Sequence, residues 1–429
     1  MTSTPNSRRP ESAIVVGGGL IGLLSAYYLR KQGLHVTVLD AQSAGSGSSR
    51  GNCGEIVPSL VGPLSTPGIL RESAGSVFKS DSALFIHPQL STEMLRFMVR
   101  FIRNTRPRTY QQTVGHLREF SADVFDLYDE MEDDGVPLHR NREGFLFLFE
   151  KAAAAQEALA NQRAMIGGVG ELLSSKEVRI MEPSLSPRVG AGYLLRDQWS
   201  IDPSAFIDSL VARLTADSVV IRESTPANRI TVGPRSASVH TPRGVFEADT
   251  CVVAAGVWSR DLCRTLGYDL DIVPGKGYSF NVDLPHPLRH TLQFADVHVV
   301  ATPMGDQVRI AGTMELDRDR DLFNPGRVNS IIAAARPFLT EEVDWTTRRN
   351  EWVGPRPMTA DGMPIIGPLP NQPRVFVAAG HGMHGLTLGA VTGRMVARLI
   401  TDPTAACVSN PFDPGTGGRT RRWRQPMKH

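Results

Sequence analysis

The stretch Ser12–Asp40, SAIVVGGGLIGLLSAYYLRKQGLHVTVLD, decides the fold of this chain. The apolar run 13–16 predicts a buried strand, and a glycine-rich turn follows it directly. Residues 23–32 predict a helix that ends before Gly33, because glycine is favoured just past the last turn of a helix. Residues 35–39 predict a second strand. Strand, turn, helix and strand in this order predict a βαβ unit and therefore a parallel sheet.

Three glycines of the turn, Gly17, Gly19 and Gly22, have the spacing G-x-G-x-x-G. In a dinucleotide-binding unit the first permits a tight turn, the second lets the pyrophosphate approach the backbone, and the third lets helix and strand pack closely. Asp40 closes the second strand, where an acid hydrogen-bonds a ribose hydroxyl and disfavours a 2′-phosphate. We therefore expect an ADP moiety on this turn. The alternative is a glycine turn in an ordinary βαβ unit.

The composition is that of a soluble globular protein large enough for two domains. The chain has 429 residues, of which 41% are hydrophobic and 21% charged, and its formal net charge is +2. This charge is too small to indicate nucleic acid as a partner. The four cysteines form no C-x-x-C pair, so we expect neither a zinc site nor a disulfide framework, in agreement with a cytoplasmic location. No apolar stretch is long enough to span a membrane.

Both ends of the chain are predicted to be flexible. Residues 1–10 are polar, carry two prolines and lack the apolar centre of a signal peptide. Residues 403–429 end in the basic sequence GRTRRWRQPMKH. We interpret this end as a solvated tail, and a weak attachment to anionic lipid on the inner face of the membrane is the alternative.

The pattern of a strand followed by glycine returns at residues 254–256 and again at 378–380. These returns indicate one nucleotide-binding domain assembled from separated segments, with a second domain inserted between them. The segments predicted for the nucleotide domain are 11–80, 196–272 and 351–402, and those for the second domain are 81–195 and 273–350. The predicted fold class is α/β, with a Rossmann-like domain and an α+β domain whose sheet is mixed or antiparallel.

This layout resembles the FAD enzymes of the D-amino-acid oxidase superfamily, and most closely the bacterial D-amino-acid dehydrogenases. The resemblance covers nearly the whole chain. Four stretches carry it: SSRGNCGEIVP (48–58), GKGYS (275–279), RPMTADG (356–362) and GHG (380–382). The chain departs from the expected pattern at three positions. Gly51 and Cys53 stand where alanines are expected, and Glu55 stands where glutamine is expected.

The resemblance implies FAD as the cofactor. The small residues of 44–54 would let the backbone lie close to it, with a flexible loop as the alternative reading. A helix starting near Gly385 would aim its positive end at the pyrimidine side of the flavin, where negative charge gathers on reduction. The expected cofactor-binding residues are Gly17, Gly19, Leu20, Ile21, Gly22, Asp40, Ala41, Ser48, Ser49, Asn52, Gly54, Ala227, Ala255, Gly256, Gly380, His381, Gly382, Gly385, Leu386 and Thr387.

Three residues are candidates for acting on the substrate, and no metal is expected. In the resembled oxidases an arginine in the sequence context of Arg356 binds the substrate carboxylate through two parallel N–H donors. The alternative for Arg356 is an ordinary surface arginine that forms ion pairs with carboxylates of the protein. Tyr278 is expected to place its hydroxyl near the same carboxylate, or else to pack on the sheet as an ordinary strand residue. His384 either belongs to the site or is a turn residue without chemistry.

The reaction that the resemblance implies is oxidation of a D-amino acid or a proline-like amine by hydride transfer to flavin N5. The resulting imino acid hydrolyses to a 2-oxo acid and ammonia, and the electrons pass to a quinone or another acceptor. Two alternatives stay open. One is a glycine- or sarcosine-type oxidase that uses oxygen, and the other is a flavin-binding subunit without turnover.

Overall fold

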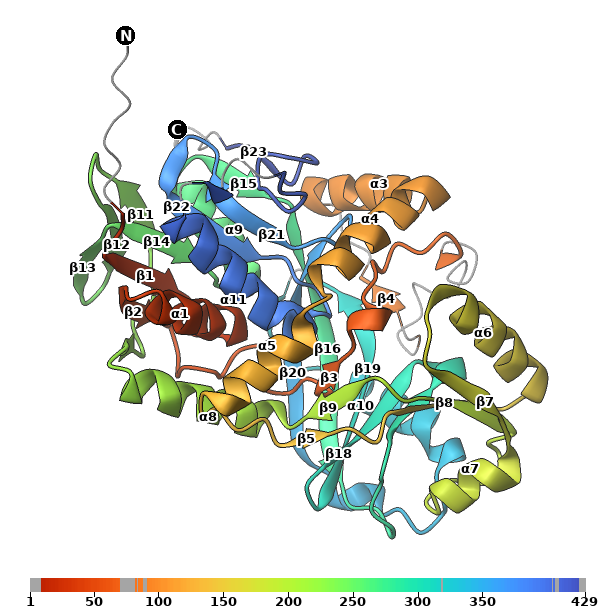
Figure 1. Cartoon of the computed structure of the whole chain (residues 1–429). Helices are drawn as coiled ribbons and strands as arrows, with labels where there is room; N and C mark the ends of the chain where they lie inside the picture. The colour runs from red at the N-terminus through yellow and green to blue at the C-terminus, as the bar shows by residue number, and fades with distance from the viewer. Residues whose placement is uncertain are drawn as a thin grey trace.

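Two β-sheets organise the chain in this computed structural model (Figure 1). The structure describes residues 9–69, 82, 84–87, 91–317, 319–402, 404–405 and 409–423. The first sheet has six strands and carries the glycine-rich turn. Their order is β10 (Val220–Arg222), β2 (His35–Leu39), β1 (Ser12–Val16), β14 (Thr250–Val253), β22 (Gln372–Ala379) and β21 (Ile365–Leu369). Every neighbouring pair is parallel except β21 and β22.

The first sheet lies between a helical layer and a smaller antiparallel sheet. On β1, Ala13 and Val15 point to the helices, and Ile14 and Val16 point to the other side. The helical layer consists of α1 (Leu20–Lys31), α5 (Val124–Asp133), α8 (Pro203–Ala216) and α11 (Gly385–Thr401). The opposite face is covered by β11 (Arg229–Val232), β12 (Ala237–Thr241), β13 (Gly244–Ala248) and α9 (Ser259–Thr265).

The second sheet is mixed and has nine strands. Its order is β20 (Arg349–Thr359), β16 (Ile272–Val282), β19 (Gln307–Leu316), β18 (Val299–Met304), β17 (Thr291–Phe294), β6 (Phe145–Phe149), β8 (Ala191–Leu195) and β7 (Val169–Ser174), and β4 (Leu84–Ile86) pairs with β19. Helix α10 (Pro325–Ala335) buries Val328 and Ile331 against this sheet. The α/β class with a parallel cofactor-type sheet and a mixed second sheet is therefore confirmed.

The remaining elements cover the edges of the two sheets. Helices α6 (Ala152–Met165) and α7 (Ser175–Met181) pack at the β7–β8 end of the second sheet. Helices α3 (Thr92–Asn104) and α4 (Pro107–Phe120) lie near the C-terminal segment (Figure 1). The short strands β3 (Glu55–Ile56), β9 (Trp199–Ile201) and β5 (Arg140–Asn141) form a third small sheet. No helix of the described residues is both long enough and apolar enough to cross a membrane.

Three sequence expectations need correction. Helix α1 begins at Leu20, earlier than the predicted residue 23, because it starts directly from the glycine turn. Strand β20 falls mostly in a segment assigned to the nucleotide domain, but it hydrogen-bonds with β16 of the second sheet. Residues 420–422 form a strand, although a flexible tail was expected over 403–429.

The C-terminal segment is held by a strand pairing and by ion pairs. Strand β23 (Thr420–Arg422) pairs with β15 (Tyr268–Leu270). The buried Arg419 guanidinium lies 2.8 Å from the Asp361 carboxylate, and Arg421 pairs with Asp269. Two of the basic side chains that suggested a lipid contact thus form ion pairs with the protein, Arg419 in the interior and Arg421 at the surface. The last residues of the chain, 424–429, lie outside the described part.

Candidate functional site

The glycine turn has the close packing that its spacing predicts. Gly17 has a positive φ of 106°, and a Cβ there would lie 2.5 Å from the carbonyl oxygen of Ala254. A Cβ at Gly22 would overlap the carbonyl oxygen of Gly17, so α1 can pack on β1 only if residue 22 is glycine. Gly19 is different, because a Cβ at this position would meet nothing within 4 Å. The space beside Gly19 is therefore open to a ligand.

The start of α1 offers unoccupied hydrogen-bond donors to that space. Gly19 is the N-cap residue and has no side chain that could cap the helix, and the first turn carries no acidic residue. The side chain of Leu20 is buried and that of Ile21 packs against the same core. Their backbone N–H groups, rather than their side chains, are therefore what a phosphate could use.

Asp40, the acid expected to bind a ribose hydroxyl, is held by two backbone N–H groups. Its carboxylate accepts hydrogen bonds from the N–H of Gly18 at 2.6 Å and of Gln42 at 2.7 Å. The acid therefore stands directly beside the glycine turn, and Ala41 follows it in an exposed position. The turn, the uncapped helix and the acid together fit the ADP part of FAD.

The loop after β2 joins the glycine turn to strand β20. The hydroxyl of Ser48 donates to the carbonyl oxygen of Pro355 at 2.8 Å, one residue before Arg356. Ser49 accepts a backbone hydrogen bond from Asn52, whose side chain in turn accepts from the N–H of Gly54 at 2.8 Å. The loop is thus built by its own hydrogen bonds rather than being free, which disfavours the flexible-loop reading.

Two further predicted segments lie near the same turn. Ala255 and Gly256 lie at the end of β14, and the Cα of Ala255 is 2.8 Å from the place of a Cβ on Gly17. Ala227 follows Thr225, whose N–H donates to the carbonyl oxygen of Asp40 at 2.6 Å. Segments distant in the sequence therefore converge on one end of the six-stranded sheet.

The second glycine turn connects β22 to α11. The N–H of Gly382 donates to the carbonyl oxygen of Pro357 at 3.0 Å, which places this turn beside the strand of Arg356. Gly380 adjoins Thr359 of the same strand. Helix α11 begins at Gly385 without a side-chain cap, and its N-terminal end carries the partial positive charge of the helix dipole.

The two histidines of this turn are anchored to the protein. Burial lowers the pKa of His381 to about 3, so its ring is neutral, and its Nε2 lies 2.9 Å from the hydroxyl of Thr392. The Nδ1 of His381 is buried and has no hydrogen-bond partner among the described residues. His384 contacts the carbonyl oxygen of Gly62 through its Nε2 at 2.8 Å.

Leu386 and Thr387 attach α11 to its neighbours. The carbonyl oxygen of the buried Leu386 accepts a hydrogen bond from the hydroxyl of Tyr128. The hydroxyl of Thr387 accepts from the N–H of Val57 at 3.1 Å and donates to the carbonyl oxygen of Glu55 at 3.2 Å. The start of α11 therefore fixes the backbone of β3.

Arg356 is an enclosed cation without a carboxylate partner among the described residues. Its guanidinium lies over Gly277 of β16, where any Cβ would overlap it. Only its Nη1 donates a hydrogen bond within the described part of the chain, to the carbonyl oxygen of Thr313 at 3.1 Å, with a longer contact to the sulfur of Met314. Burial lowers the pKa of Arg356, and the nearby carboxylate of Glu55 opposes this shift. Nε and Nη2 remain available for a planar anion.

Cys53, Glu55 and Gln293 complete what we call the Arg356 cluster. The carboxamide of Gln293 donates a hydrogen bond to Oε1 of Glu55. Burial raises the pKa of Glu55 to about 7 and the pKa of the Cys53 thiol to about 12. Cys53, Glu55 and Arg356 nevertheless keep part of their surface accessible to solvent. Sequence reasoning noted Cys53 and Glu55 only as departures, and nothing in the TLQF strand pointed to Gln293.

Thr313, the residue that accepts from Arg356, has a conformation that is rare for a β-branched residue. Its φ is +61°, and its hydroxyl is buried without a hydrogen-bond partner in the described part of the chain. Such residues concentrate at functional sites. No sequence signal marks this position.

The structure does not bring Tyr278 to Arg356. Alternation along β16 places Gly277 on the face of Arg356 and Tyr278 on the opposite face. The Tyr278 hydroxyl donates to the carboxylate of Glu315, and its ring packs near Phe323. The prediction of a substrate-binding Tyr278 is therefore replaced by the alternative of a packed strand tyrosine.

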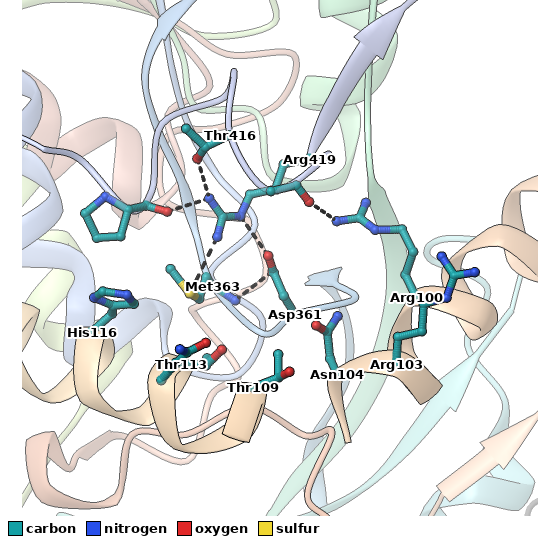
Figure 2. Close-up of a pocket in the computed structure, with 13 residues that line it drawn as sticks. Arg100, Arg103, Asn104, Thr109, Thr113, His116, Asp361, Met363, Thr416 and Arg419 are labelled. Atoms are coloured by element: carbon teal, nitrogen blue, oxygen red, sulfur yellow. Dashed lines mark hydrogen bonds and ion pairs between the residues drawn. The ribbon is translucent and has the colours of Figure 1, made fainter. Parts of the chain in front are cut away.

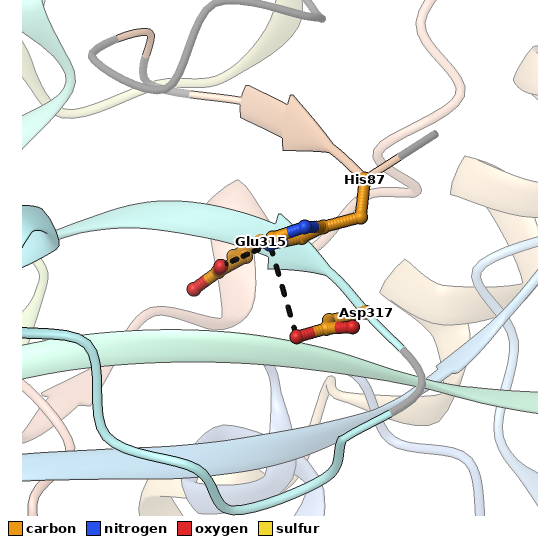
Figure 3. Close-up of side chains that lie close together, drawn as sticks. All are labelled: His87, Glu315 and Asp317. Atoms are coloured by element: carbon orange, nitrogen blue, oxygen red, sulfur yellow. Dashed lines mark hydrogen bonds and ion pairs between the residues drawn. The ribbon is translucent and has the colours of Figure 1, made fainter. Parts of the chain in front are cut away.

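Tyr278 belongs to a separate group of charges. Figure 3 shows His87, Glu315 and Asp317 close together, with ligand atoms within 4.8 Å of one another. The ammonium of Lys276 lies 2.9 Å from the carboxylate of Asp317 and 3.7 Å from that of Glu315. This buried lysine already supplies a positive charge to the carboxylates.

A cavity in the described part of the chain lies away from these residues. It has a volume of about 420 Å³ and lies between α3, α4 and the C-terminal segment (Figure 2). The Arg419–Asp361 ion pair forms one wall, and Arg100, Arg103 and His116 line other parts. None of the predicted site residues lines it.

Comparison with known proteins identifies the family. Residues 12–399 match the family model described as DAO, FAD dependent oxidoreductase. The chain belongs to this family. A D-amino acid dehydrogenase from Cereibacter sphaeroides (strain ATCC 17029 / ATH 2.4.9) is 31% identical over 400 residues, which cover 90% of this chain and 91% of the relative.

Two solved structures share the fold. Glycine oxidase from Geobacillus kaustophilus has a TM-score of 0.71 at 22% identity, with 95% of this chain and 98% of the other chain covered. L-alpha-glycerophosphate oxidase from Mycoplasma pneumoniae, solved with FAD bound, has a TM-score of 0.68 at 18% identity, with 91% and 94% covered. The cofactor of this chain is FAD, as in its family, and the open space at Gly19 and the uncapped α1 fit it.

The contrast between Gly19 and Gly22 gives a direct test of the cofactor site. Gly19→Ala should fold normally, because φ is −71° and the space around its Cβ is open, but the methyl group should intrude on the pyrophosphate and lower the FAD content. Gly22→Ala should lower the free energy of unfolding by about 1–3 kcal/mol or prevent folding, because the methyl group overlaps backbone. Flavin absorbance and thermal unfolding measure the two effects. A Gly19→Ala protein with full flavin would contradict the assignment.

Proposed function

We propose that the chain is an FAD-dependent dehydrogenase that oxidises a D-amino acid or a proline-like amine. The observation that carries this proposal is the enclosed guanidinium of Arg356, which forms no ion pair with any carboxylate of the described residues. A buried cation is costly unless an anion meets it, and the carboxylate of an amino acid is the matching ligand. The name of the relative from Cereibacter sphaeroides supports the choice of substrate class.

The residues of this chain have separable roles in the proposed reaction. The donors of the first glycine turn and Asp40 hold the ADP end of the cofactor, and the positive end of α11 lies at the second glycine turn. Bound FAD supplies a hydride acceptor. Arg356 orients the substrate by its carboxylate, so that the α-carbon is presented in one direction. The electrons then leave to a quinone or a similar acceptor.

Anaerobic mixing with a panel of D-, L- and N-methyl amino acids and prolines tests the proposed function. A D-amino acid or a proline should bleach the flavin absorbance, and re-oxidation by a soluble quinone should be faster than by oxygen. Rapid formation of peroxide would instead indicate an oxidase of the glycine or sarcosine type. If no amine bleaches the flavin, the chain is a flavin-binding protein without this activity.

Substitution of Arg356 tests its role in binding the carboxylate. Arg356→Ala should lower kcat/KM by roughly 30- to 5,000-fold, because loss of a buried charge partner costs about 2–5 kcal/mol. Arg356→Lys should lower kcat/KM by a smaller factor. An ammonium group keeps the positive charge but does not have the planar pair of N–H donors of the guanidinium. The control is Arg349→Ala on the same strand, whose exposed side chain pairs with Asp283 and should leave kcat/KM unchanged. An Arg356→Ala enzyme with full flavin and unchanged kcat/KM would contradict the role.

A further inference from the structure

Glu55 is a carboxylate whose position is fixed from several sides. It lies on β3, which pairs with β9 through Glu55 and Ser200. The hydroxyl of Thr387 donates to its carbonyl oxygen at 3.2 Å, and the Gln293 carboxamide from β17 donates to its Oε1. Its second oxygen, Oε2, receives no hydrogen bond from the described residues. One acceptor atom of a well-positioned carboxyl group is therefore free beside Arg356.

The charges around Glu55 leave this carboxylate without an ion-pair partner among the described residues. The guanidinium of Arg356 lowers the pKa of Glu55 and so does the hydrogen bond from Gln293, but burial has the larger, opposite effect and brings it to about 7. The thiol of Cys53, whose pKa is raised to about 12, is neutral at this pH. Glu55 is thus an anion above about pH 7, and a cationic ligand group would stabilise that anion.

We propose that Glu55 binds the ammonium group of the substrate and accepts its proton, so that Glu55 and Arg356 together select zwitterionic 2-amino acids over 2-hydroxy acids. This inference rests on the proposed function and deepens it. Arg356 offers a cation to the carboxylate, and Glu55 offers an anion to the amine. A 2-hydroxy acid carries no cation and leaves the Glu55 carboxylate unpaired, which disfavours its binding.

The proton transfer prepares the amine for oxidation. One N–H bond of the ammonium breaks, its proton moves to Oε2 of Glu55, and the electron pair stays on nitrogen. That pair would then form the C=N bond as the α-C–H bond breaks, and bound FAD would supply the acceptor for the hydrogen and both its electrons. The substrate loses two electrons and the cofactor gains two, so the step balances without a further reagent.

A pair of unreactive ligands tests this role without turnover. 2-Aminoisobutyrate has an ammonium and a carboxylate but no α-hydrogen, and isobutyrate lacks only the amine. The dissociation constant of each for the holoenzyme is measured from the perturbation of the flavin absorbance between about pH 6 and pH 8.5. The variants are Glu55→Gln, which keeps the size and a partner for Gln293, and the exposed control Glu143→Gln.

Wild-type protein at pH 8.5 should bind 2-aminoisobutyrate roughly 10- to 100-fold more tightly than isobutyrate, the range expected for one charge-assisted hydrogen bond. This preference should vanish as the pH falls below about 7, because Glu55 becomes protonated. Glu55→Gln should lose the preference at every pH, and Glu143→Gln should keep it. A preference that persists in Glu55→Gln, or one in the wild type that does not change with pH, would overturn the inference.

The same ligands separate this inference from the proposed function. If 2-aminoisobutyrate binds with the predicted dependence on Glu55 but no amino acid bleaches the flavin, the result contradicts the proposed function and supports the role of Glu55 in binding the amine. If amino acids bleach the flavin while Glu55→Gln leaves the preference for the amine unchanged, the reaction stands and the role of Glu55 fails. If the Glu55→Gln variant does not fold, the pH dependence of the wild-type preference for 2-aminoisobutyrate over isobutyrate decides whether Glu55 has this role.

Discussion

The contact between Gly22 and the carbonyl oxygen of Gly17 is the constraint on which the rest of this structure depends. It leaves no room for a side chain, and it fixes the start of α1 against the end of β1. The N–H groups of the first helical turn therefore face the open space at Gly19, with the Asp40 carboxylate beside it. The close approach of Gly17 to Ala254 then brings in a third segment of the chain. One end of the first sheet thus becomes a site for a large anionic cofactor.

The second sheet contributes Arg356, the residue proposed to bind the substrate carboxylate. Strands β16 and β20 pair along most of their length, and glycine at position 277 leaves room for the guanidinium of Arg356. On the opposite face of the same strands, the ammonium of Lys276 pairs with the carboxylate of Glu315, to which the hydroxyl of Tyr278 also donates a hydrogen bond. Arg356 and Glu55 form no ion pair with the described residues, and charged groups left unpaired in this way are what the proposed binding site requires.

Much of the fold could be predicted from the sequence because its signals are local. The strand is predicted by the apolar run before Gly17, the turn by the glycine spacing and the ribose-binding acid by Asp40. All three signals lie within about thirty residues of one another. The nucleotide-type sheet was also predictable, because the pattern of a strand followed by glycine recurs at Gly256 and Gly380. The pairing of β20 with the second sheet could not be predicted, because strand pairing depends on contacts between segments that are distant in the sequence.

The candidate site was predictable only in part for the same reason. Arg356 was found through its sequence context, whereas Tyr278 was misplaced because a strand puts successive side chains on opposite faces. Gln293 and Thr313 contact Glu55 and Arg356, which are distant from them in the sequence, so no short motif identifies these two residues. The order of the C-terminal segment depends on the buried Arg419–Asp361 pair, and basic composition alone gave no sign of that partner.

A crystal structure of the protein with FAD and 2-aminoisobutyrate would test the central claim most directly. The account predicts that the ligand carboxylate lies within about 3 Å of the free guanidinium nitrogens of Arg356, with the amine at the same distance from Glu55. A ligand carboxylate bound elsewhere, or an Arg356 that forms an ion pair with the protein, would contradict it.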